Sequence, residues 1–110
     1  MTREELIANL KEKLGVREGP EADLQGDGYA LVIAMEPEEV TEELVGRLQA
    51  LKAKKGVRRM IAIPPKATVM NAAREKTEGT GIGVIDGRGF IIKPFSWSRY
   101  RSVPLGTYKG

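Results

Sequence analysis

Aromatic rings and positive charges are concentrated at the C-terminal end of this sequence. Five of its six aromatic residues lie between positions 90 and 108. The 21 residues from 90 to 110 also contain four Lys or Arg residues and no Asp or Glu. Aromatic rings can stack on nucleic-acid bases, while lysine and arginine can bind phosphates. The alternative is that the rings anchor a C-terminal strand to the protein core.

The spacing within this segment favours a linear contact surface. Phe95, Trp97 and the arginines at 99 and 101 alternate with other residues, so they share one face of an extended chain. Packing of Trp97 in a subunit interface is the alternative. We predict a nucleic-acid-binding surface made of Lys93, Phe95, Trp97, Arg99, Tyr100 and Arg101, with further phosphate contacts from Arg58, Arg59 and Lys66.

The charge is distributed unevenly along the chain. Residues 1–50 contain 5 Lys or Arg against 12 Asp or Glu, a net charge of −7. Residues 51–110 contain 13 against 3, a net charge of +10. A basic half of this kind is typical of a protein with a polyanionic partner. The alternative is that the two halves neutralise each other in the folded protein.

Composition excludes several classes of function. The chain has no Cys and no His, so it can form neither a disulfide framework nor a histidine-based catalytic or metal site. Its 110 residues fit one domain, 1–110, with 93–110 as a basic, aromatic C-terminal segment. No apolar run is long enough to span a bilayer. We expect a cytoplasmic protein without a cofactor, and the 30% of charged residues is typical of thermophiles.

The hydrophobic pattern predicts an α/β (α+β) fold. A capping box at Thr2–Glu5 and a stop at Gly15 define the first helix. Helices are predicted at residues 3–14, 41–56 and 67–76, and strands at 29–35, 58–63, 81–86 and 89–95. A short strand within 16–28 would complete the order α-(β)-β-α-β-α-β-β. This order implies a mixed sheet of four to five strands with about three helices packed on it, its last hairpin adding an antiparallel edge strand.

The glycine-rich stretch from 79 to 89 does not fit a phosphate-binding loop. Such loops follow a strand and open a helix, whereas these glycines follow a predicted helix and lie in a hairpin. We interpret Gly79 or Gly81 as a helix C-cap, and Asp86-Gly87-Arg88-Gly89 as the hairpin turn.

Residues 27–92 resemble the core of restriction-endonuclease-like nucleases in their order of strands and helices. In that family an acid precedes an (Asp/Glu)-x-Lys triplet that binds metal. Here Asp27 could stand for the first acid, but Ala34 and Glu36 occupy the places of the triplet's acid and lysine. The departure implies no catalytic residues and no metal site. A metal-dependent, structure-selective nuclease using Asp27 and Glu36 stays as the enzymatic alternative.

A second resemblance covers most of the chain. A small domain without Cys, with helices on a sheet and a basic, aromatic C-terminal half, looks like the ThermoDBP-related single-stranded-DNA-binding proteins of hyperthermophilic archaea. The resemblance implies a non-enzymatic protein that binds single-stranded DNA and forms homo-oligomers. RNA as the ligand is an alternative. Another is a structural oligomerisation domain that exchanges its C-terminal segment between subunits.

Overall fold

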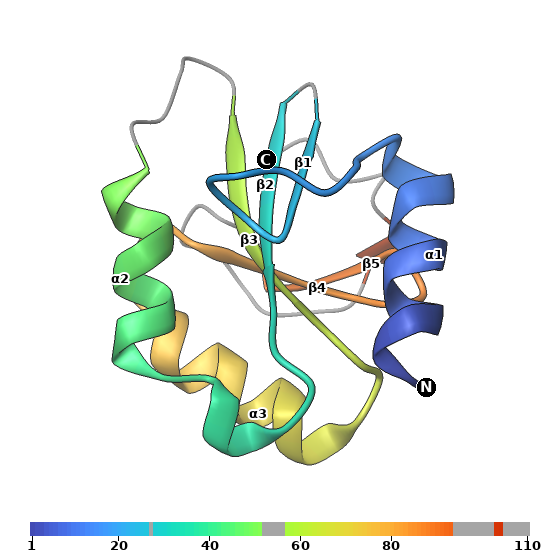
Figure 1. The fold of residues 1–110 in the computed structure, drawn as a ribbon. Coiled ribbons are helices and arrows are strands. Elements are labelled where there is room, and N and C mark those ends of the chain that lie inside the picture. The colour runs from blue at the N-terminus through green and yellow to red at the C-terminus, as the bar shows by residue number, and fades with distance from the viewer. Residues whose placement is uncertain (27, 52–56, 94–102, 105–110) are drawn as a thin grey trace.

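Helices cover both faces of a single mixed β-sheet (Figure 1). The computed structural model describes residues 1–26, 28–51, 57–93 and 103–104. In these residues the sheet has six strands in the order β1-β2-β3-β4-β5-β6. The elements are α1 Arg3–Leu14, β1 Leu24–Gly26, β2 Tyr29–Ile33, the 3₁₀ helix η1 Pro37–Glu39, α2 Glu42–Ala50, β3 Arg58–Ile63, α3 Ala67–Thr77, β4 Gly83–Asp86, β5 Phe90–Lys93 and β6 Val103–Pro104.

The three central strands run parallel, and the outer strands run antiparallel to their neighbours. Helices α2 and α3 are the crossovers that join β2 to β3 and β3 to β4. Strands β1 and β5 pair antiparallel with β2 and β4. The predicted fold class, a mixed sheet with helices in this order, is confirmed. The prediction that β5 forms the edge is wrong, because Phe90 and Ile91 pair with Pro104 and Val103 of β6.

Two apolar cores lie on opposite faces of the sheet. On β3, Ile61 and Ile63 belong to the core beneath α2 and α3, whereas Met60 and Ala62 belong to the core beneath α1. All four side chains are fully buried. This alternation explains why the sequence of a central parallel strand is apolar at every position. The polar residues of these strands are therefore found at their ends.

The helix boundaries agree with the prediction where local signals set them. Thr2 Oγ1 accepts a hydrogen bond from Glu5 N at 3.2 Å, and Glu5 Oε1 accepts one from Thr2 N at 3.1 Å. Hydrogen bonding of the Glu5 carboxylate, first with the backbone N–H of Thr2 and then with its side chain, lowers the pKa of Glu5 below its ordinary value. At the other end of α1, Gly15 has the left-handed conformation that stops a helix.

Several predicted elements are shorter in the structure; the strand predicted at 81–86, for example, begins at Gly83. The helix predicted at 41–56 begins after its cap Thr41 but ends at Ala50, because Leu51 has extended backbone angles. Residues 52–56 lie outside the described residues. The strand predicted at 29–35 ends at Ile33, before the turn of η1. Prediction by hydrophobic pattern extended the last two elements past the points at which the chain turns.

Candidate nucleic-acid interface

The parallel strands give the sheet two chemically different ends. We call the end at which β2, β3 and β4 begin the amino end, and the opposite one the carboxyl end. Arg58 and Arg59 begin β3, so they lie at the amino end. Because β5 is antiparallel, its last residue, Lys93, is also at this end, paired with Val84 near the start of β4. The fold thus places three of the predicted residues toward one end of the sheet, with Lys93 level with Ile61 and two strands away from Arg58 and Arg59.

Tyr29 adds an aromatic ring to the amino end. It begins β2 and is the register partner of Arg58 on β3. The Arg58 guanidinium carbon lies over the Tyr29 ring, 6.0 Å from its centroid, at the outer limit of a cation–π contact. Both residues are half-buried. Sequence analysis did not identify Tyr29 as a site residue, because it reads as the first residue of a buried strand.

Arg59 has a structural task as well as a charge. Its Nη1 donates hydrogen bonds to the carbonyl oxygens of Leu48 and Gln49, both at 3.3 Å. These carbonyls belong to the last turn of α2, where backbone donors become scarce, and the Leu48 oxygen also accepts a hydrogen bond from Leu51 N at 3.3 Å. Among the described residues, no carboxylate lies within ion-pair distance of Arg59. Within the described ranges, the positive charge of Arg59 therefore has no acid that compensates it.

Lys66 lies at the opposite end of the sheet from Arg58 and Arg59. It follows the end of β3, a strand of six residues that spans roughly 17 Å. Its Nζ forms an ion pair with Glu36 Oε2 at 2.9 Å. The two residues line a pocket of about 320 Å³ together with Met1, Met35, Pro64 and Pro65. The structure does not bring Lys66 together with the cations of the amino end.

Acidic residues gather at the same carboxyl end as Lys66. Glu38 and Glu39 lie in η1, which follows β2, and Glu42 and Glu43 form the first turn of α2. Carboxylates are favourable there because the N-terminus of a helix carries partial positive charge. Acids of the N-terminal half thus gather at the carboxyl end of the sheet, where Lys66 is paired with one of them.

The remaining predicted site residues lie outside the described residues. They are Phe95, Trp97, Arg99, Tyr100 and Arg101. Residues 94–102 join Lys93, the last residue of β5, to Val103, the first of β6. These two strands are antiparallel neighbours. The covalent connection that carries the predicted stacking residues thus starts from the amino end of the sheet.

The acids considered for a metal site do not form a group in the part of the chain that is described. Glu36 pairs with Lys66, and Asp27 lies outside the described residues. Asp23 accepts a hydrogen bond from Ile33 N at 2.8 Å and pairs with Arg47 at 3.7 Å. No group of three or more His, Cys, Asp or Glu residues that could hold a metal ion occurs in the described ranges.

Comparison with known proteins identifies no relative. No protein-family model matches the chain, and neither a curated protein nor a solved structure matches it. Within the described residues, none of the helices combines the length and the apolar character needed to cross a membrane.

The position of Arg59 generates a stability prediction. Arg59→Ala removes the donor to two carbonyls of α2, so we expect the free energy of unfolding to fall by about 1–2 kcal/mol. Arg3→Ala, at an exposed position of α1, serves as the control and should change stability by less. Urea denaturation of both variants measures the difference. Equal midpoints for Arg59→Ala and the wild type would contradict the capping role.

Proposed function

We propose that this protein binds single-stranded nucleic acid without catalysis, with single-stranded DNA as the ligand and RNA as the alternative. The observation that carries the proposal is the grouping of Arg58, Arg59 and Tyr29 at the amino end of the sheet, where β5 also ends at Lys93. From this end the chain continues into the segment that contains Trp97, Arg99 and Arg101. Cations and rings are the two groups that single-strand binding requires.

The separation of charges supports a polyanionic ligand over mutual neutralisation. The positive charges of Lys66 and Lys76 are compensated by ion pairs with Glu36 and Glu42. Arg59, in contrast, donates to backbone carbonyls, and no acid in the part of the chain that is described forms an ion pair with it. A positive end on a protein whose opposite end is acidic would also orient an approaching polyanion.

Aromatic residues near the cations favour a single strand over a duplex as the ligand. Base faces are hidden inside a double helix, whereas unpaired bases can stack on aromatic side chains and arginine planes. Stacking contributes similarly for every base, so the proposed protein should bind with little sequence preference. The resemblance to ThermoDBP-related proteins agrees with this proposal and adds the expectation of a homo-oligomer.

Salt dependence tests the electrostatic part of the proposal. The affinity for a fluorescein-labelled oligothymidylate should fall steeply with salt, with a log–log slope of about −0.7 per phosphate contact. Arg58→Gln should reduce the magnitude of the slope by about 0.7, because it removes one cation from the amino end. Lys66→Gln, at the carboxyl end, is the matched control and should leave the slope unchanged. Fluorescence anisotropy measures both, and a flat salt response of the wild type would refute the proposal.

Trp97 tests the stacking part. Trp97→Ala should weaken binding by about 1–3 kcal/mol, a roughly 5- to 150-fold rise in Kd, because one ring no longer stacks on a base. A tryptophan in the core or in a subunit interface would instead change the melting temperature or the oligomeric mass. Affinity, melting temperature and light-scattering mass of the same sample separate these roles. Unchanged affinity would show that the ring serves packing.

The enzymatic alternative is tested by incubation of labelled single-stranded and branched DNA with Mg²⁺ or Mn²⁺. We expect no cleavage, because Ala34 and Glu36 replace the acid and the lysine that the nuclease triplet requires. Asp27→Asn is the control that links any observed cleavage to this chain. Cleavage by the wild type that disappears in Asp27→Asn would establish the nuclease in place of the binding protein.

A further inference from the structure

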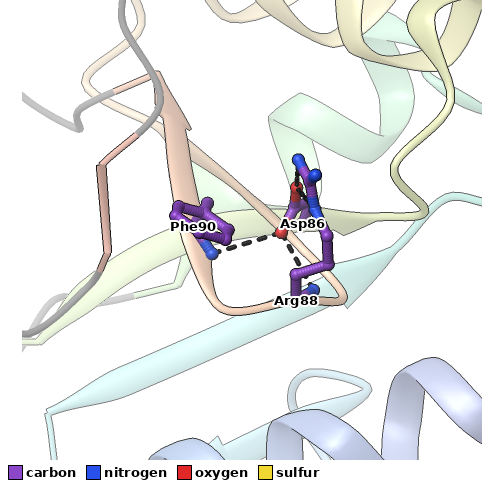
Figure 2. Close-up of polar contacts among 3 residues, drawn as sticks. All are labelled: Asp86, Arg88 and Phe90. Carbon is purple, nitrogen blue, oxygen red and sulfur yellow. Dashed lines mark hydrogen bonds and ion pairs between the residues drawn. The ribbon is translucent and has the colours of Figure 1, made fainter.

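The turn between β4 and β5 contains a buried carboxylate. Asp86 is completely buried, and both of its side-chain oxygens accept hydrogen bonds (Figure 2). Oδ1 accepts from the backbone N–H of Arg88 at 2.9 Å and of Phe90 at 3.1 Å. Oδ2 accepts from Arg88 Nε at 2.8 Å and Nη2 at 2.6 Å. Asp86 therefore fixes both the backbone of the turn and the guanidinium of Arg88.

The hydrogen bonds with Asp86 reduce both the mobility and the net charge of the Arg88 side chain. A free arginine side chain loses rotamer entropy when it is immobilised against a ligand, and Asp86 has already immobilised this one. The carboxylate also compensates its positive charge. Arg88 is thus a planar group of fixed position that offers little net charge to a phosphate.

The fixed guanidinium lies over an aromatic ring. Arg88 Cζ is 5.0 Å from the centroid of the Phe90 ring, within the range of a cation–π contact. The Arg88 side chain nevertheless remains 49% exposed. Figure 2 shows both side chains projecting from the same turn. Arg88 thus combines a ring contact on its guanidinium with a side chain that is half-exposed.

We infer that Arg88 is a base-stacking residue, and that a base of the bound strand lies on the exposed side of its guanidinium, over Phe90. The inference rests on the proposed function and extends it to the end of β5 that is opposite to Lys93. Arginine planes accept bases in the same way as aromatic rings do. The four residues of β5 cover about 10 Å, which corresponds to about three nucleotides of a stacked strand. One strand could therefore contact both ends of β5.

A second cation lies at the same turn. The Cδ of Lys13, from α1, is 2.8 Å from the place where a Cβ on Gly89 would lie. Gly89 has a φ of +89°, so the turn requires glycine there, and the lysine stem covers it. No ion pair holds Lys13 in the described part of the chain. Lys13 is placed to bind the phosphate next to the stacked base.

The two cations of the turn should give different signatures in a binding experiment. Arg88→Lys keeps the charge but removes the plane, so the affinity for a labelled oligothymidylate should fall at least about fivefold with an unchanged salt slope. Lys13→Gln should instead reduce the magnitude of the slope by about 0.7. Arg47→Lys is the matched control: Arg47 is 51% exposed and pairs with Asp23, but no ring contact of Arg47 occurs among the described residues. It should bind as the wild type does.

The outcomes separate this inference from the proposed function. A wild-type protein that does not bind the oligonucleotide refutes both. Wild-type binding with equal affinity of Arg88→Lys refutes the stacking role alone. A second measurement needs no variant: the NMR resonance of Arg88 Nε–H, which Asp86 holds, should shift when unlabelled oligothymidylate is added. If other resonances shift on binding and this one does not, Arg88 only stabilises the turn.

Discussion

Strands β2, β3 and β4 bury both of their faces, and this constraint determines where the protein can carry functional side chains. Helices α2 and α3 cover one face as crossovers, and α1 must cover the other with Leu6 and Leu10. The strand interiors then have no position for a polar group that is not fully paired. Reactive or binding side chains are limited to the two ends of the sheet and to its β5–β6 edge. The candidate interface follows from this limit.

The same parallel arrangement separates the charges. Each crossover helix starts at the carboxyl end of the sheet and finishes at the amino end. For α2, this direction favours Glu42 and Glu43 in its first turn and a cation such as Arg59 at its last carbonyls. The positive end that we propose for nucleic acid is therefore built partly from charges that the fold already uses for its own stability. A small domain can therefore carry a basic end without a large net positive charge.

Local signals allowed the sequence to predict α1 and β3 to the residue, since a capping box, a terminal glycine and flanking prolines are all encoded within a few positions. The end of α2 was missed because Arg59, a tertiary partner, caps it earlier than the run of Ala, Leu and Lys residues suggests. Lys66 was grouped with Arg58 by charge, although a whole strand separates them. Tyr29 and Arg88 are not identified from the sequence, because the contact of Tyr29 with Arg58 depends on strand register and the position of Arg88 depends on the buried Asp86.

The two arginine–ring pairs differ in what holds them, and this difference bears on their function. Strand register places Arg58 beside Tyr29, at 6.0 Å, whereas a buried carboxylate holds Arg88 over Phe90. The hydrogen bonds that Asp86 Oδ1 accepts from the backbone N–H groups of Arg88 and Phe90 are explained by their stabilisation of the turn. The buried Oδ2 also needs a donor, and Arg88 gives it two N–H groups while its side chain stays half-exposed, which avoids the cost of burying a second charge. The same half-exposed position over a ring leaves the guanidinium within reach of the stacking ligand that we propose.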